Sequence, residues 1–323
     1  MLSFLEKNFN IPILFLIFNR PNTTQIVFNE IKKIKPIKLY IAADGPRSDN
    51  INDKKLCEET KEIIGQINWE CDTHTLFREK NLGCKNAVSS ALSWFFENEE
   101  MGIILEDDCL PTISFFWFCK ELLIKYKDDN RIMMISGMNY FNNMIEMDQS
   151  YFFSNYTIVW GWASWRRAWK LYEINMKGWK YFYDNKYINY IYNNKKFIRF
   201  ALSMFKNTYE KRIDTWDIQW YFSTLINNGL SIIPKYNLVT NIGIEGTHVN
   251  EKSKVHFMPT KAINYNNIIH PKFIILDYKY NNLLINKIAN GLPNYKTRKI
   301  KIFFIRIFRI PKKIFKIFKF RKN

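Results

Sequence analysis

The chain has 323 residues, 47% of them hydrophobic and 17% aromatic, and this apolar content excludes an intrinsically disordered protein. The formal net charge is +18, but residues 296–323 hold twelve Lys or Arg and no Asp or Glu, so the first 295 residues carry only +6. The five cysteines are odd in number and form no CxxC pair, which argues against a disulfide or zinc framework and favours reduced thiols in a cytoplasmic protein.

The chain begins with an apolar run, Ile11–Phe18, that ends abruptly at Asn19-Arg20-Pro21. Eight residues are too few to span a membrane, and no small-residue cleavage site follows, so the run predicts a buried strand. Pro21 predicts a helix start directly after it. A second strand is predicted over Lys38–Ala43, ending at Asp44.

Helix and strand patterns continue to alternate after Asp44. They predict a helix over Cys57–Gln66, a strand over Thr73–Phe77, a helix over Asn86–Glu97 and a strand over Gly102–Leu105. Alternation with short connections is typical of a doubly wound, Rossmann-like α/β sheet. Neither GxGxxG nor GxxxxGK[ST] is present, which excludes a standard dinucleotide fingerprint and a P-loop.

Three adjacent acids, Glu106-Asp107-Asp108, follow the buried strand that ends at Leu105. Carboxylates are costly in a protein interior unless a cation or hydrogen bonds compensate them. Oxygen ligands at this position suit Mg²⁺ or Mn²⁺ together with a phosphate-bearing substrate. A solvated acidic turn is the alternative interpretation.

Asp44, Arg78 and the acidic triplet all follow predicted strands. Ligands of open α/β sheets bind outside the carboxyl ends of the strands, so we expect these side chains to converge on one crevice.

The segment Thr157–Tyr172 is rich in tryptophan, with Trp162, Trp165 and Trp169 at helical spacing. This spacing predicts a packed amphipathic helix. Trp160-Gly161-Trp162 is less easily explained as core, because aromatic faces beside a glycine commonly support sugar rings.

A further helix is predicted from Thr215 to about Asn228, with Asp217 in its first turn. An acid at that position also suits the helix dipole, so a capping role is the alternative to a catalytic one. Two short strands are predicted over Leu230–Pro234 and Tyr236–Thr240. His248, in the loop that follows, is a weak candidate for contact with a metal or diphosphate.

Taken together, these segments resemble metal-dependent glycosyltransferases of the GT-A fold, and among them the N-acetylglucosaminyltransferase I type and related bacterial enzymes. The resemblance covers about residues 11–249. Its matching pieces, in order, are PILFLIFNR (Pro12–Arg20), IAADGPR (Ile41–Arg47), ILEDDCLPTISFF (Ile104–Phe116), ISGMN (Ile135–Asn139), WGWASW (Trp160–Trp165) and TWDIQW…IIPKYNLVTNIG…GTH (Thr215–His248).

The resemblance implies a set of donor-binding residues. Arg20 and Asp44 would contact the nucleotide base and ribose. Glu106 and Asp107 would hold ribose and sugar hydroxyls. Asp108 would ligate Mn²⁺ or Mg²⁺ bridging the diphosphate.

The remaining predicted site residues lie on both sides of this donor set. Arg78 and Trp162 would complete the donor contacts. Asp217 would be the general base, with Asp214 as the fallback, because the family often has a tandem acid where this chain has Asp217-Ile218.

The function implied is an inverting, metal-dependent glycosyltransferase that moves a sugar from a nucleotide-diphosphate donor, most simply a UDP-sugar, to a saccharide or glycolipid hydroxyl. This activity would serve glycolipid or surface-polysaccharide synthesis. A sugar-nucleotide pyrophosphorylase shares the α/β nucleotide fold and is the enzymatic alternative. A non-catalytic lipid- or nucleic-acid-binding protein is the alternative from another class.

The predicted domain organisation is a catalytic domain over residues 1–295 and a tail over 296–323. Residues 11–140 would form the nucleotide-sugar half and 141–250 the acceptor half. The tail interleaves basic and Ile/Phe residues and predicts a basic amphipathic helix that lies on anionic lipid, at the inner face of the cell membrane. Nucleic acid would fit its charge but not its dense apolar stripe.

Overall fold

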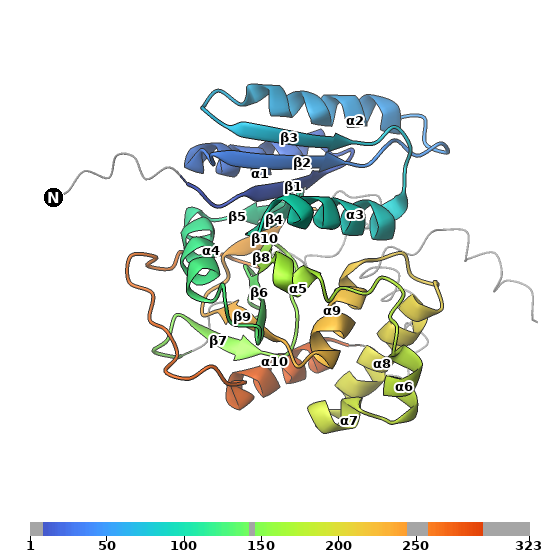
Figure 1. The fold of residues 1–323 in the computed structure, drawn as a ribbon, viewed down its shortest axis with the longest axis vertical. Coiled ribbons are helices and arrows are strands. Elements are labelled where there is room, and N and C mark those ends of the chain that lie inside the picture. Colours follow the sequence, from blue (N-terminus) through green and yellow to red (C-terminus); the bar gives the residue numbers. More distant parts are fainter. Residues whose placement is uncertain (1–8, 142–145, 244–257, 293–323) are drawn as a thin grey trace, which may run out of the picture.

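The computed structural model describes residues 9–141, 146–243 and 258–292 (Figure 1). Eight strands form one mixed sheet in the order β3-β2-β1-β4-β8-β6-β9-β7, which confirms the predicted Rossmann-like α/β fold. The predicted tail lies outside the described residues. The strands of the sheet are β1 (Ile13–Ile17), β2 (Lys38–Ala43), β3 (Asp72–Phe77), β4 (Met101–Glu106), β6 (Ile132–Ser136), β7 (Tyr151–Ser154), β8 (Trp162–Trp165) and β9 (Leu230–Pro234).

The first half of the sheet is parallel. β1 pairs with β2 and β4, and β2 pairs with β3, all in the same direction. β8 then lies antiparallel between β4 and β6, and β7 lies antiparallel to β9. β1 and most of β2 are buried, which is why both read as continuous apolar runs in the sequence.

Helices cover both faces of the sheet (Figure 1). α1 contacts α4, which packs on β4, β6 and β8, while α3 packs on β1 and β2 and contacts α5. The helices next to the sheet are α1 (Pro21–Ile34), α2 (Asp53–Glu62), the 3-10 turn η1 (Ile63–Gln66), α3 (Gly83–Asn98), α4 (Ile113–Lys125) and α5 (Arg166–Trp169). Pro21 is the first residue of α1, as predicted.

The remaining helices lie mostly to one side, at the lower right of Figure 1. They have a separate aromatic core in which Trp179, Phe182 and Phe205 are buried. These helices are α6 (Trp179–Asp184), α7 (Ile188–Ile191), α8 (Lys195–Tyr209), α9 (Asp217–Ile226) and α10 (Tyr278–Gly291). Among the described residues, no helix has both the length and the apolarity needed to cross a membrane.

The prediction of one helix over Thr157–Tyr172 is wrong. Trp162–Trp165 forms strand β8, which pairs with β4 and β6, and only the four residues of α5 are helical. Trp162 and Trp165 belong to cores on opposite faces of the sheet. Pairing with distant strands outweighs the local helical spacing here.

Gly161, directly before β8, occupies a position that only glycine fits. Its φ is +61°, and a Cβ there would lie 2.7 Å from Val239 Cγ2. We expect Gly161→Ala to lower the free energy of unfolding by about 1–3 kcal/mol more than Gly178→Ala, measured by urea denaturation. Gly178 is the matched control because its φ is +89° and a Cβ there would meet nothing within 4 Å. Equal losses would show that backbone conformation alone sets the cost.

Candidate functional site at the carboxyl edge of the sheet

A cavity of about 610 Å³ opens where β1, β2 and β4 end and α3 begins. Five of the sequence-predicted site residues line it, together with the predicted fallback base Asp214. These five are Arg20, Asp44, Arg78, Glu106 and Asp107. The expected convergence at the carboxyl edge of the sheet is therefore present for most of the donor set.

Arg20 lies at the junction of β1 and α1 and binds both adjacent aspartates. Its Nη1 donates to Asp108 Oδ2 at 2.7 Å, its Nε donates to Asp107 Oδ2 at 3.3 Å, and its Nη2 donates to Asp107 Oδ1. The three side chains are between 4% and 17% exposed. Burial by itself lowers the pKa of Arg20, but the two carboxylates outweigh it and raise that pKa further above its ordinary value. The guanidinium is the counter-ion that makes two buried acids tolerable.

Within the described part of the chain, the oxygen atoms around Asp108 are too few to hold a divalent cation by themselves. No group of three or more His, Cys, Asp or Glu that could hold a metal occurs in the described ranges. Asp108 Oδ2 is already bonded to a guanidinium. Mg²⁺ is commonly held by one or two carboxylates together with substrate phosphates. Asp108 is not among the residues that line the cavity, so it fits a cation shared with a diphosphate only if Arg20 releases its Oδ2, and not a cation held by the protein alone.

Asp44, at the end of β2, bonds the loop that leads into α3. Its carboxylate accepts bonds from Leu82 N at 2.9 Å, Gly83 N at 3.2 Å and Asn81 Nδ2 at 2.9 Å. Burial raises the pKa of Asp44, although these backbone bonds and Arg78 act in the opposite direction. Asp44 thus lines the cavity and also fixes its rim.

Arg78 and Glu106 also line the cavity. Arg78 Nη2 donates to Ser90 Oγ of α3 at 2.7 Å, and burial lowers the Arg78 pKa, against the attraction of Asp44. Glu106 is the last residue of β4, next to Leu16 of β1 in the sheet.

The two candidate bases occupy different places. Asp214 lines the cavity and accepts bonds from Cys84 N at 3.0 Å and Lys85 N at 3.3 Å, so it caps the N-terminus of α3. Asp217 is the first residue of α9 and accepts a bond from the Thr215 hydroxyl. Because Asp217 follows Asp214 by three positions, their Cα atoms lie within about 11 Å of each other.

Asp217 also lies close to two half-buried tyrosines, Tyr140 and Tyr172. Burial, and after it the Asp217 charge, raises the pKa of Tyr140 to about 12. The same two causes raise the pKa of Tyr172. Asp217 therefore lies near these two tyrosines and is not among the residues that line the crevice.

Trp162 lies in the core. Its side chain is 1% exposed and packs with Trp169, Trp216 and Trp220 at ring-centroid distances of 5.6 to 6.5 Å. It is not among the residues that line the crevice. Burial in this cluster explains the tryptophan-rich motif without a sugar contact.

The chain returns to Asp108 through a small second sheet. β5 (Cys109–Pro111) pairs antiparallel with β10 (Val239–Asn241), and Ile242 N donates to the Asp108 carbonyl oxygen at 2.8 Å. A Cβ at Gly243 would lie 2.5 Å from Asp108 Oδ2, so a glycine permits this close approach. His248 lies outside the described residues.

The sequence alone did not identify Arg47, which also lines the cavity. Its guanidinium is held by Asp53: Arg47 Nη2 donates to Asp53 Oδ1 at 2.8 Å, and Asn19 Nδ2 donates to the same oxygen at 2.8 Å. The link joins the ends of β1 and β2 to α2. The segment IAADGPR contains Arg47, but its partner Asp53 follows six residues later at the start of α2. An acid at a helix start is common, so nothing in the sequence links the two residues.

Asp53 gives the stability of the protein a dependence on acid pH. Burial raises its pKa, but the bonds from Arg47 and Asn19 outweigh burial and leave that pKa below 3.8. A lowered folded-state pKa contributes stability above the unfolded value of about 3.9 that is lost as pH falls through the folded value. We expect the loss of unfolding free energy below pH 4 to be smaller in Asp53→Asn than in the wild type, measured by urea denaturation from pH 6 to pH 2.5. Parallel curves would contradict this.

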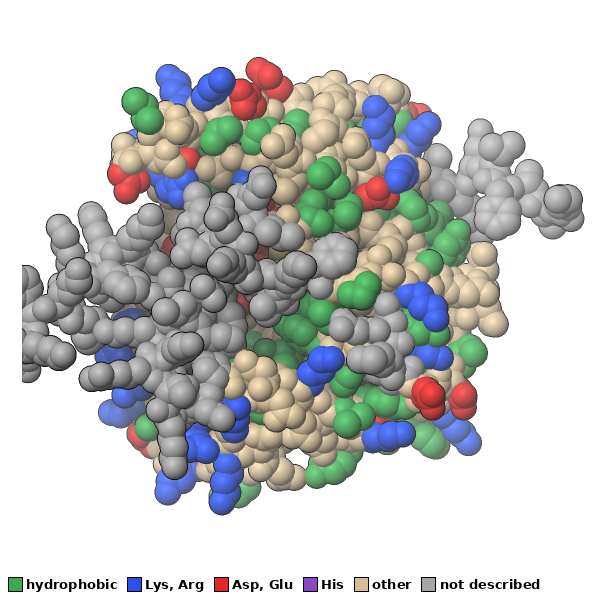
Figure 2. Space-filling model, turned by 180° about the vertical axis from the view of Figure 1, so that it is seen from behind, with side chains coloured by type: hydrophobic (Ala, Val, Ile, Leu, Met, Phe, Trp, Pro, Cys, Tyr) green, Lys and Arg blue, Asp and Glu red, His purple; other side chains and the backbone are tan. Residues whose placement is uncertain are grey.

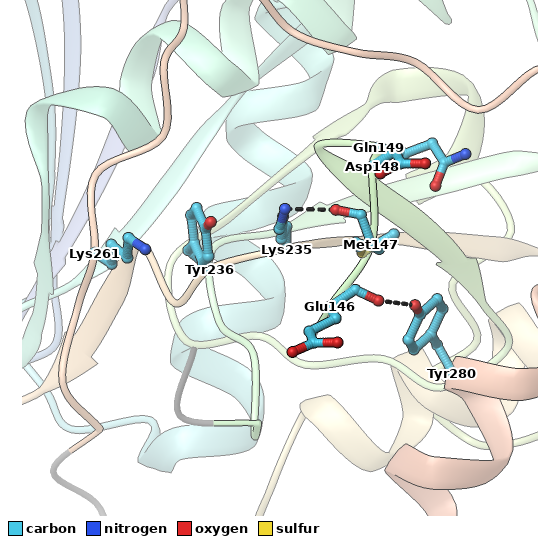
Figure 3. Close-up of a pocket in the computed structure, with 8 residues that line it drawn as sticks. All are labelled: Glu146, Met147, Asp148, Gln149, Lys235, Tyr236, Lys261 and Tyr280. Carbon is cyan, nitrogen blue, oxygen red and sulfur yellow. Dashed lines mark hydrogen bonds between the residues drawn. The ribbon is translucent and has the colours of Figure 1, made fainter. Parts of the chain in front are cut away.

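A second cavity, of about 630 Å³, lies elsewhere, beside the segment that follows β9 (Figure 3). Lys235 Nζ donates to the Met147 carbonyl oxygen at 2.5 Å, and Lys261 Nζ lies 4.1 Å from the ring centroid of Tyr236. Burial raises the pKa of Tyr236, but the two ammonium groups outweigh it and lower that pKa. None of the sequence-predicted site residues lines this cavity, so the crevice is the candidate site.

Comparison with known proteins adds little to this geometry. No protein-family model matches the sequence, and no curated protein matches it. The inositol-1-phosphate CTP transferase from T. maritima is similar over 52% of this chain and 76% of its own, with 10% identity and a TM-score of 0.31. HddC from Yersinia pseudotuberculosis is similar over 39% of this chain and 56% of its own, with 8% identity and a TM-score of 0.25. Likeness at this level assigns neither family nor activity.

Proposed function

We propose that this chain is a glycosyltransferase that binds a nucleotide-diphosphate sugar in the crevice and transfers the sugar, with inversion, to a hydroxyl acceptor. The observation that carries the proposal is the cavity itself. Guanidinium groups of Arg20, Arg47 and Arg78 share it with the acids Glu106 and Asp107 at the carboxyl ends of the strands. Guanidinium groups recognise phosphate oxygens, and carboxylates accept bonds from ribose and sugar hydroxyls.

Asp108 is the residue that would hold Mn²⁺ or Mg²⁺, jointly with the donor diphosphate. When bound, the cation would supply stabilisation of the negative charge on the departing diphosphate. The chain itself contributes Arg20, which can leave Asp108 and pair with a phosphate oxygen. It also contributes Arg78, whose bond to Ser90 fixes it on the rim.

Asp217 is the proposed base. Both Asp214 oxygens accept backbone N–H bonds from α3, so that carboxylate is already engaged as a helix cap, which favours Asp217 for the role. The acceptor hydroxyl must lose its proton as it attacks, and a carboxylate in reach typically contributes about 10²- to 10⁴-fold. A single base on the acceptor side implies one displacement, hence inversion.

The acceptor is proposed to be a saccharide or glycolipid, and the donor most simply a UDP-sugar. The sequence of the tail supports work at the inner membrane face, because basic amphipathic segments bind anionic lipid. The five cysteines form no disulfide, which is consistent with that location.

A product assay tests the proposal against its nearest rival. Wild-type protein with Mn²⁺ and a panel of nucleotide-diphosphate sugars should release nucleoside diphosphate, and Asp108→Asn should lose the Mn²⁺-dependent part. Asp128→Asn is the matched control, because Asp128 is 88% exposed on the surface. Release of pyrophosphate from a nucleoside triphosphate and a sugar phosphate, without release of diphosphate from any sugar donor, would establish a pyrophosphorylase instead.

A further inference from the structure

The helices α6–α8 carry the positive charge of the folded body. Residues 177–212, which contain these helices, hold nine Lys or Arg and two Asp or Glu, an excess of seven positive charges. Outside this segment and residues 296–323, the rest of the chain has a net charge of −1. The charge is therefore confined to one part of the folded structure.

Exposed tyrosines share this surface with the lysines. Tyr181 is 66% exposed and Tyr190 is 82% exposed, and Tyr187 lies between them with ring-centroid distances of 5.8 and 6.3 Å. The hydrophobic core beneath these tyrosines is formed by other side chains, among them Trp179 and Phe182 of α6. The outward tyrosines therefore are not required for packing the helices.

Several lysines of the surface have no acidic partner. Lys180, Lys186 and Lys195 are exposed, and they make no ion pair with any residue in the part of the chain that the structure describes. Figure 2 shows the molecule from behind, so its lower left corresponds to the lower right of Figure 1, where α6–α8 lie. Blue side chains gather there. Acidic side chains are sparse in that area and more evident at the top and right.

The C-terminal segment leaves the described structure next to the same surface. Lys196 Nζ of α8 donates to the carbonyl oxygen of Leu292, the last described residue, at 2.8 Å. Asn194 Nδ2 donates to Asn286 Oδ1 of α10 at 2.8 Å. The sequence that follows holds the twelve basic residues of 296–323. The last described residue of the chain thus lies against α8.

We propose that the α6–α8 surface docks on an anionic lipid membrane, with the lysine ammonium groups over the headgroups and the exposed tyrosines in the interface. Lysines near such a surface are attracted to it, and tyrosine is enriched at membrane–water interfaces because it has an apolar ring and a polar end. The proposal needs only this surface and is independent of the chemistry assigned to the crevice.

The test compares two matched charge reversals in the full chain. Lys180→Glu with Lys186→Glu removes charge from the proposed surface, and Lys54→Glu with Lys55→Glu removes the same charge from α2, at the opposite end of Figure 1. Binding is measured by co-sedimentation with vesicles of phosphatidylglycerol and phosphatidylcholine, with vesicles of phosphatidylcholine alone as the uncharged reference. Unfolding midpoints of all variants establish that they are folded.

Each basic side chain at an anionic surface is worth roughly five-fold in affinity. The first pair should therefore weaken binding at least ten-fold and the α2 pair less than two-fold. Tyr181→Ser with Tyr190→Ser should weaken binding while leaving the net charge unchanged. Equal losses for both lysine pairs, absence of vesicle binding, or binding of single-stranded RNA in place of vesicles would overturn the proposal.

Discussion

Replacing Arg20 with methionine is expected to lower the free energy of unfolding by about 3–5 kcal/mol, because it removes the guanidinium that is bonded to the buried carboxylates of Asp107 and Asp108. Removing one member of a buried ion pair costs much more than removing an exposed one. Arg20 is 17% exposed and its two partners are 4% and 9% exposed. Urea denaturation at pH 7 measures the difference directly.

Arg131→Met is the matched control for Arg20→Met. Arg131 also pairs with an aspartate, Asp129, at 2.7 Å, but its side chain is 59% exposed. Exposed pairs contribute about 0–1 kcal/mol. A second arm adds Mn²⁺ with a nucleoside diphosphate, which should recover part of the stability lost in Arg20→Met. Losses of similar size in the two variants would show that Arg20 is not the counter-ion of the acids.

Replacing Asp217 with asparagine is expected to lower the turnover of sugar transfer by about 10²- to 10⁴-fold while leaving nucleoside diphosphate affinity within about two-fold. Asp217 is not among the residues that line the crevice. Its loss should therefore impair removal of the acceptor proton and not the binding of the donor. Steady-state rates and equilibrium titration, made on the same preparation, separate the two effects.

Asp214→Asn distinguishes the two candidate bases. Asp214 caps α3 through two backbone bonds. Asp214→Asn should therefore lower the free energy of unfolding, and it should lower turnover less than Asp217→Asn does. A larger loss of turnover in Asp214→Asn would transfer the role of base to that residue.

Local patterns predicted the N-terminal half of the fold well. Lys38–Ala43 coincides with β2 and Gly102–Leu105 lies within β4, because strands buried on both faces appear as apolar runs. Pro21 marked the first residue of α1. The later strands were harder, since β8 is set by pairing with β4 and β6, which no nearby residue signals.

The sequence predicted most of the residues that line the candidate site, but not the hydrogen bonds that connect them. Strand ends place Asp44 and Asp107 at one edge, so their convergence follows from topology. That Arg20 is bonded to an acid 87 residues away, and that Asp214 caps a helix 130 residues away, depends on contacts between distant segments. Trp162 is a different case. Its sequence context suggested contact with a sugar, but its side chain is buried in the core.

Titration of UDP into the full chain by calorimetry, with and without Mn²⁺, tests whether Asp108 and a bound diphosphate share a cation. A cation shared between Asp108 and a diphosphate predicts that UDP binds at least ten-fold more tightly with Mn²⁺, and that Mn²⁺ alone gives no measurable binding while Arg20 occupies the carboxylate. Asp108→Asn should abolish the difference. Mn²⁺ binding of equal strength with and without UDP, or no UDP binding at all, would contradict the account.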